Sequence, residues 1–141
     1  MKDEKKHLIS IEEVEPMDVD NIEGFKGLDA RFLVSKSTFA DAECCVFRCV
    51  FPVGAYHSNH VHHKSDEIVY CVSGQVVQAV DGIEYHLKPN QVIRVPKGTP
   101  HWTRNDGPEP YVCLGFFPDA NDYDDTDQHV VDGPKFPKRE K

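Results

Sequence analysis

Hydrophobic and polar residues follow one another in short runs through the middle of the chain, and no run keeps a helical period. From Ala30 onward, short apolar segments are separated by turn residues such as Gly, Pro, Asn and Asp. This texture is typical of β-strands joined by tight turns. The pattern predicts an all-β domain over residues 30–117, with strands at 31–35, 44–53, around 60–62, 68–72, 75–80, 83–88, 91–95, 101–105 and 111–117.

One hairpin is marked clearly by its turn residues. Asp81 and Gly82 separate two apolar runs, and this pair suits the left-handed conformation of a two-residue hairpin turn. In the second run Ile83, Tyr85 and Leu87 alternate with polar or charged neighbours, so we expect one buried and one solvated face. Eight or nine strands at this spacing fit a jelly roll, in which two sheets pack face to face.

The two ends of the chain differ from the middle. Residues 1–29 are polar and acidic, and the capping-box spacing of Ser10–Glu13 predicts a short helical start that ends before Pro16. Residues 118–141 are too charged and too poor in apolar side chains to form a core alone. We expect two short irregular arms, the second either solvated or laid across a partner chain through residues such as Tyr123.

Composition narrows the function classes. A chain of 141 residues is long enough for one domain with its own core. The net charge of −8 argues against nucleic acid and anionic membranes as partners. Neither a secretory signal nor a long apolar run is present, so we expect a cytoplasmic protein. Its five cysteines, mostly in apolar strand patterns, favour reduced thiols over disulfides: Cys44, Cys45, Cys49, Cys71 and Cys113.

The spacing of three polar residues suggests a shared metal ion. His60 and His62 lie two apart, so in a strand their imidazoles point to the same side. The next four residues can turn the chain, which lets Glu67 open the returning strand and face both histidines. His101 follows a proline and glycine turn and is a fourth candidate ligand. The neighbouring His63 points the opposite way, and we expect the remaining histidines to be surface residues: His7, His86 and His129.

These residues also carry a family resemblance. The pattern G-x5-H-x-H-x4-E-x6-G is met by Gly54, His60, His62, Glu67 and Gly74. It resembles the first sequence motif of the cupin superfamily, and the residues fill it without a gap.

A second motif strengthens the resemblance. The cupin pattern G-x5-P-x-G-x2-H-x3-N is similar to the arrangement of Pro96, Gly98, His101 and Asn105, with Asn90 in place of the first glycine. Asn tolerates a left-handed turn better than most residues, so this departure is mild. The resemblance covers residues 30–117 and implies a small single-domain cupin: a jelly-roll β-barrel (double-stranded β-helix) with one divalent transition metal ion bound by His60, His62, Glu67 and His101.

Such a ligand set constrains the chemistry. Three neutral imidazoles and one carboxylate leave a divalent ion with about one net positive charge, which attracts anionic or enolisable oxygen ligands. A six-coordinate ion would keep two positions open for a substrate, dioxygen or water. The nitrogen and oxygen donors suit Fe(II), which we favour, and also Mn(II), Ni(II), Co(II) and Zn(II).

We therefore expect a metal-dependent enzyme, first of all an iron-type dioxygenase acting on a small anionic or enolisable molecule. The alternatives are a redox-neutral isomerase, cyclase or lyase, and a non-catalytic module that binds a metal or small molecule.

The resemblance also implies a homodimer. Trp102 should face away from His101, and the candidate catalytic residues are Glu67, His57 and Tyr56 near the barrel mouth, and Arg48, which would hold a substrate carboxylate unless it faces outward.

Overall fold

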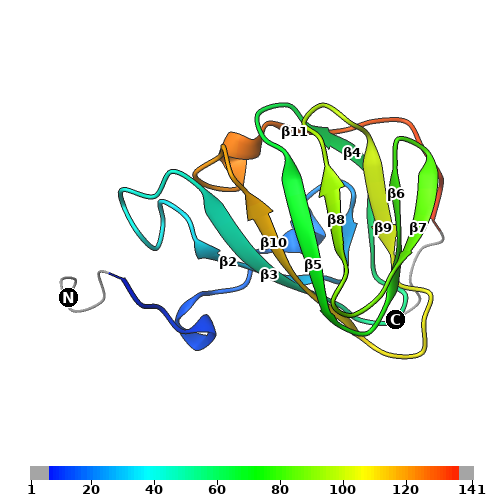
Figure 1. The fold of residues 1–141 in the computed structure, drawn as a ribbon, viewed down its shortest axis with the longest axis horizontal. Coiled ribbons are helices and arrows are strands. Elements are labelled where there is room, and N and C mark those ends of the chain that lie inside the picture. The colour runs from blue at the N-terminus through cyan, green and yellow to red at the C-terminus, as the bar shows by residue number, and fades with distance from the viewer. Residues whose placement is uncertain (1–6, 137–141) are drawn as a thin grey trace.

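The computed structural model describes residues 7–136, and within them two antiparallel sheets pack face to face (Figure 1). The expected all-β jelly roll is confirmed. The first sheet has the order β1-β4-β9-β6-β7, with β11 also paired to β4, and contains β1 (Phe25–Lys26), β4 (Tyr56–His62), β6 (Val76–Val80), β7 (Ile83–Leu87), β9 (His101–Arg104) and β11 (Gln128–Val130). The second has the order β2-β3-β10-β5-β8 and contains β2 (Asp29–Val34), β3 (Cys45–Phe51), β5 (Glu67–Ser73), β8 (Val92–Val95) and β10 (Tyr111–Phe117).

The main core lies between the sheets and is rich in aromatic side chains. Strands β3 and β10 alternate buried and half-buried residues, because each turns one face to the interior. The Phe47 ring packs 5.4 Å from those of Phe32 and Phe117. Gly115 is the cross-strand partner of Phe47, and a Cβ atom there would collide with the ring. The glycine is therefore required by close packing.

The turn predictions at two places are confirmed. Asp81 and Gly82 have φ values of 54° and 81°, so both residues of the β6–β7 hairpin are left-handed, as a two-residue turn of this kind requires. Asn90, which stands where the cupin motif has glycine, has a φ of 71°. It provides the left-handed conformation for which the motif uses glycine.

The buried face expected for β7 is wrong over most of the strand. Ile83 and Tyr85 are 58% and 45% exposed, and only Leu87 reaches the core. Strand β7 is the edge of its sheet, and Val92 on β8, the edge of the other sheet, is 59% exposed. Alternation alone locates a pleated strand, but at an edge the layer that would cover its apolar side can be missing.

The N-terminal arm begins as expected and then joins the barrel. A 3-10 turn, η2 (Ile11–Glu13), starts where the capping box was predicted, and the Ser10 backbone N–H donates to the Glu13 carboxylate at 3.1 Å. After a second turn, η3 (Val19–Asn21), β1 pairs with the start of β4. Within residues 7–136, no helix is long and apolar enough to cross a bilayer.

The described part of the C-terminal arm, residues 118–136, does not extend into solvent. It folds onto its own barrel through a 3-10 turn, η4 (Asp124–Thr126), and then β11, which pairs with the second half of β4. Ala120 and Thr126 are completely buried. The charged segment is ordered because its few uncharged residues face the barrel, where a core already exists.

Candidate metal centre

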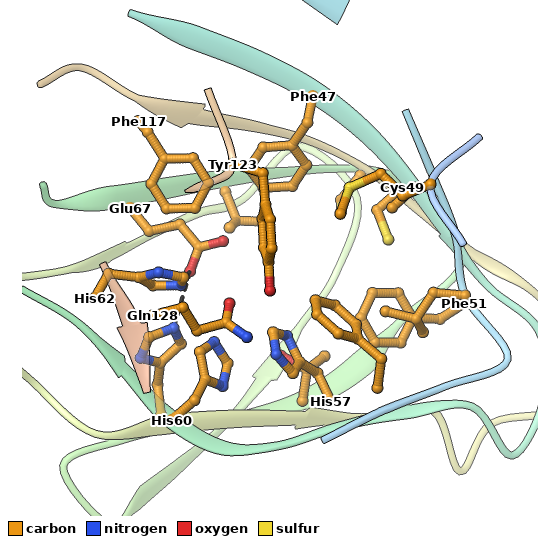
Figure 2. A pocket seen from close by; sticks show the side chains of 18 of the residues that line it. Phe47, Cys49, Phe51, His57, His60, His62, Glu67, Phe117, Tyr123 and Gln128 are labelled. Carbon is orange, nitrogen blue, oxygen red and sulfur yellow. Dashed lines mark hydrogen bonds and ion pairs between the residues drawn. The ribbon is translucent and has the colours of Figure 1, made fainter. Parts of the chain in front are cut away.

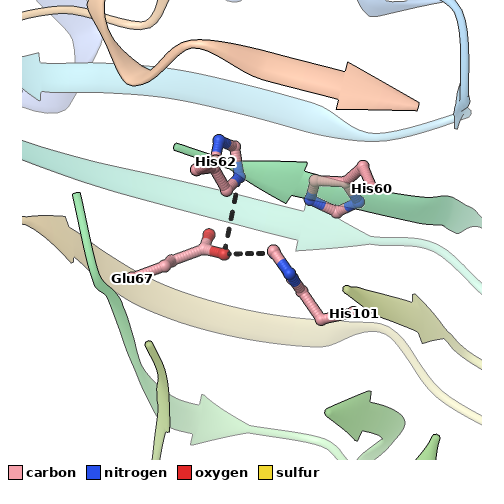
Figure 3. Close-up of side chains that lie close together, drawn as sticks. All are labelled: His60, His62, Glu67 and His101. Atoms are coloured by element: carbon pink, nitrogen blue, oxygen red, sulfur yellow. Dashed lines mark hydrogen bonds and ion pairs between the residues drawn. The ribbon is translucent and has the colours of Figure 1, made fainter. Parts of the chain in front are cut away.

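Four side chains from three strands meet inside the barrel. β4 carries His60 and His62, and His60 lies directly across from His101 at the start of β9. Glu67 enters from the opposite sheet as the first residue of β5. The ligand atoms of these four residues all lie within 4.8 Å of one another (Figure 3). The structure therefore brings together all four residues of the predicted ligand set.

Two of the imidazoles are held by backbone carbonyl groups. His60 Nδ1 lies 2.6 Å from the Ser58 carbonyl oxygen, and His101 Nδ1 lies 2.9 Å from that of Thr99. A carbonyl oxygen can only accept a hydrogen bond, so each Nδ1 carries the proton. The lone pair of each neutral ring is then on Nε2, the nitrogen that faces the cluster.

The third imidazole is held by a side chain from the C-terminal arm. His62 Nδ1 lies 3.1 Å from Thr126 Oγ1, and the Thr126 hydroxyl donates to the Tyr123 carbonyl oxygen at 2.7 Å. Since that bond uses the single hydroxyl proton, Thr126 accepts from His62 Nδ1–H. His60 and His62 thus present an unprotonated Nε2 to the same point, toward which His101 Nε2 also faces.

The donor set fits a divalent cation. Within the described part of the chain, His60 Nε2 and His62 Nε2 are buried without a hydrogen-bond partner. His101 Nε2 lies 2.9 Å and His62 Nε2 3.8 Å from Glu67 Oε1. Buried lone pairs that converge beside a carboxylate are unfavourable unless a cation lies between them. Neutral imidazole and carboxylate are the forms that bind a metal ion.

Burial keeps the ring nitrogens available. Removal from water lowers the pKa of His60 well below its ordinary value and that of His62 to about 4, and neighbouring histidines lower both further. Burial would raise the pKa of Glu67, but the hydrogen bond and charge of His101 outweigh it, so that pKa lies below its ordinary value. Near neutral pH the His60 and His62 rings are therefore neutral and Glu67 is a carboxylate.

His57, a candidate catalytic residue, lies in the wall beside the cluster. Its ring is stacked between Phe25 at 3.8 Å and His60 at 3.5 Å. Among the described residues no group pairs with its Nε2, which is buried. Burial lowers its pKa well below the ordinary value. His57 can therefore contact a molecule bound at the cluster without itself belonging to the four-residue set.

A cavity opens in front of the cluster (Figure 2). It offers about 60 Å³ to the centres of water molecules. One ordered water needs roughly 10–15 Å³ by this measure, so the space suits roughly five waters or one small ring. No lysine or arginine belongs to the described residues around it. Its walls include Gln78 and Thr103 and are rich in aromatic side chains: Phe25, Phe32, Phe47, Phe51, Tyr111, Phe117 and Tyr123.

Two predicted site residues do not face this cavity. Arg48 alternates with Phe47 and Cys49, which line it, so Arg48 points from the opposite face of β3. The Tyr56 ring packs against Phe136, 5.0 Å away, and is also absent from the cavity wall. These positions correct the expectation that Arg48 and Tyr56 contact a substrate.

The other expectations about neighbouring rings hold. Trp102 is 5% exposed and faces away from the cluster, where it packs 5.4 Å from Phe136. His63 is exposed, as are the three histidines expected at the surface: His7, His86 and His129. Within the described chain the cysteines are all free, Cys44 exposed and the other four buried.

Three residues near the site were missed from sequence: Tyr123 and Gln128, which line the cavity, and Thr126, which holds His62. All three come from the arm. The charge of residues 119–127 hides their contribution, and β11 is only three residues long. A strand so short gives no alternation to detect.

Three curated proteins are similar to this chain. It is 27% identical over 84 residues to an uncharacterized protein of Methanocaldococcus jannaschii, covering 60% of this chain and 67% of that protein. It is 31% identical over 74 residues to quercetin 2,3-dioxygenase of Bacillus subtilis, covering 52% and 22%. It is 28% identical over 102 residues to polyketide synthase CurC of Streptomyces cyaneus, covering 72% and 62%. The chain thus matches only about a fifth of the dioxygenase.

Solved structures and a family model agree with the fold. The polyketide cyclase RemF of Streptomyces resistomycificus superposes with a TM-score of 0.72 at 16% identity, covering 92% of this chain and 88% of that one. A predicted oxalate decarboxylase of Thermotoga maritima gives 0.68 at 24% identity, covering 77% and 96%. The family model described as the cupin domain matches residues 47–117, half of the chain and all four clustered residues. The protein therefore belongs to the cupin domain family.

Proposed function

We propose that this protein is a metal-dependent dioxygenase that acts on a small enolisable molecule. One observation carries the proposal: three imidazole Nε2 atoms and a carboxylate converge at the wall of a cavity that is rich in aromatic rings and has room for a small ring. A binding-only barrel would gain little from placing a metal beside such a cavity. His60, His62, Glu67 and His101 would hold the ion, which we propose to be Fe(II), with Mn(II), Co(II), Ni(II) or Zn(II) as alternatives.

The bound ion would supply charge stabilisation for an enolate oxygen and, as iron, a position for dioxygen. The protein's own groups prepare the site for this. The Glu67 carboxylate offsets part of the positive charge, and the Nδ1 partners of the three rings fix their orientation. The aromatic walls limit access of water to the reacting atoms.

The cavity favours an enolisable substrate over a carboxylate. A carboxylate far from the metal would need a cationic partner, and none of the described lining residues is lysine or arginine. Aromatic walls instead suit a flat, neutral ring. Two relatives are named for quercetin and for polyketides, compounds that carry enolisable ketones, and this supports the same substrate chemistry.

A redox-neutral reaction is the second candidate, and His57 is the observation that favours it. Its buried, unpartnered Nε2 lies beside the cluster and is suited to accept or return a proton. A cyclase or isomerase needs such a group and no oxidant.

Reaction in air and under argon separates the two candidates. The full chain is prepared anaerobically, loaded with Fe(II) or Zn(II), and supplied with hydroxypyranones and other enolisable ring compounds while oxygen uptake and products are measured. The dioxygenase predicts consumption of oxygen by the iron form and no turnover under argon. Full turnover of the zinc form under argon would overturn it in favour of a cyclase, isomerase or lyase.

A further inference from the structure

The C-terminal arm supplies two polar side chains to the wall of the cavity. Tyr123 immediately precedes η4 and Gln128 begins β11, and both line the space in front of the metal cluster. In Figure 2 the Tyr123 ring stands in the cavity, and its hydroxyl points between Gln128 and His57. The arm therefore delivers two neutral hydrogen-bonding groups to the place where a substrate must lie.

The register of β11 fixes one of these groups beside a metal ligand. Gln128 lies directly across from His62 in the β11–β4 pair, so the two side chains are on the same face of the sheet. Thr126, between Tyr123 and Gln128, is completely buried and holds His62 through Nδ1. The geometry of the two polar side chains is thus tied to the geometry of the candidate metal centre.

The hydrogen bonds of these two side chains are incomplete. The side chains of Gln128 and Tyr123 interact, and the Tyr123 hydroxyl carries a proton that it can donate to another acceptor. Gln128 Oε1 is buried and has no partner among the described residues. A buried amide oxygen left unpaired is costly, so the missing donor is expected on a ligand.

One ligand group completes both bonds at once. A hydroxyl can accept from Tyr123 O–H and donate to Gln128 Oε1, whereas a methyl group can do neither and a carboxylate cannot donate. Building on the proposed function, we propose that Tyr123 and Gln128 are specificity-determining residues that recognise a hydroxyl substituent of the substrate ring.

Two hydroxypyranones that differ in one hydroxyl test this inference. Kojic acid and allomaltol share the same enol–ketone pair that binds metal ions, but kojic acid carries a hydroxymethyl group where allomaltol has a methyl. Their dissociation constants are measured by calorimetry on the full chain loaded with Zn(II), which does not consume dioxygen. We expect the wild type to bind kojic acid about 5- to 150-fold more tightly, the range of two net hydrogen bonds.

The variants Tyr123→Phe and Gln128→Leu should each lower the affinity ratio, because each removes one of the two groups that bind the hydroxyl of kojic acid. Tyr85→Phe, an exposed tyrosine on β7, is the matched control and should keep the full ratio. A purely structural role would change the affinity for both probes equally. A ratio near one in the wild type, or one that survives both substitutions, would overturn the inference alone. Failure of both probes to bind would overturn the proposed substrate class and this inference with it.

Discussion

Each imidazole of the candidate metal centre is fixed at Nδ1, and the three partners differ in how far they lie along the chain. His60 and His101 use carbonyl groups only two residues before them in the chain. The local backbone is enough to place such a carbonyl group close to the ring. His62 uses Thr126, 64 residues away. The orientation of this one ligand therefore depends on the fold of the arm, whereas that of the other two is local.

Removal of single histidines should separate ligands from neighbours. His60→Ala or His101→Ala should sharply lower the amount of divalent metal bound per chain, because each removes one of four converging donors. His63→Ala is the control and should leave metal binding unchanged, since His63 is exposed and outside the cluster. Elemental analysis after dialysis against Zn(II) measures the occupancy. Loss of metal in His63→Ala with full occupancy in His60→Ala would contradict the assigned ligand set.

Loss of the Thr126 hydroxyl should weaken metal binding without unfolding the protein. Thr126→Val keeps the shape of the side chain but removes the acceptor for His62 Nδ1–H. Loss of such a partner typically lowers metal affinity about 10- to 100-fold. Competition with a chromogenic chelator measures this, and circular dichroism checks the fold. Thr126→Ser, which retains a hydroxyl, should restore most of the affinity. Equal losses in both variants would contradict the role of the hydrogen bond.

At the scale of elements, the sequence predicted the strands that carry the motif residues and failed at the sheet edges. Spacing between His60, His62 and Glu67 requires a strand, a turn and a returning strand, and β4 and β5 have these bounds. The face of β7 could not be predicted, because burial there depends on the neighbouring layer. β11 could not be detected in the sequence, because it is defined by its pairing with β4 and has no alternating pattern of its own.

Close contact between β10 and β3 should make one glycine irreplaceable. A Cβ at Gly115 would collide with the Phe47 ring, which is packed against two other phenylalanines and has little room to move. Overpacking of this kind costs about 1–3 kcal/mol of unfolding free energy. Gly107→Ala is the matched control, since its Cβ would meet Asn105 Oδ1 at 3.4 Å and the Gln75 carbonyl oxygen at 3.9 Å, with no closer contact. Urea unfolding measures the free energy of unfolding of both variants. If Gly115→Ala were as stable as the wild type, β3 and β10 could move apart there without cost.

The turn before β5 should contribute stability that depends on pH. Asp66 accepts the Lys97 backbone N–H at 2.9 Å and the Arg94 guanidinium at 3.0 Å, and these bonds lower its pKa. A lowered folded pKa means that the stabilisation is present above the unfolded value of about 3.9 and is lost as the pH falls through the folded pKa.

Asp66→Asn should accordingly lower the unfolding free energy at neutral pH, and the difference from wild type should shrink in acid. Asp81→Asn, in a hairpin turn that also tolerates Asn, is the matched control for the exchange of the side chain. A difference between Asp66→Asn and wild type that stays constant from neutral pH into acid would contradict the proposed linkage.

At the scale of the whole molecule, the two motifs predicted the fold and the four clustered residues, because the spacing within each motif reflects how strands and turns alternate in one barrel. The cavity was less predictable, since its walls combine residues from both sheets with Tyr123 and Gln128 from the arm. For this reason Arg48 was predicted to contact a substrate, although its side chain points from the face of β3 opposite to the cavity. The homodimer stays a prediction, which sedimentation equilibrium would test.

Removal of the metal should leave the barrel folded. The larger core packs between the sheets through residues such as Phe47, Phe51 and Tyr111, none of which depends on an ion. Binding to the folded state alone adds stability of about 2.7 kcal/mol when the free ion is 100 times its dissociation constant. Thermal unfolding with Zn(II) and with a chelator should thus show two cooperative transitions, the zinc form at the higher temperature. Glu67→Gln should unfold like the chelated wild type and gain much less from zinc, because the amide keeps the shape of the side chain but not its charge. Unfolding of the chelated protein at room temperature would mean that the metal, and not the aromatic core, holds the two sheets together.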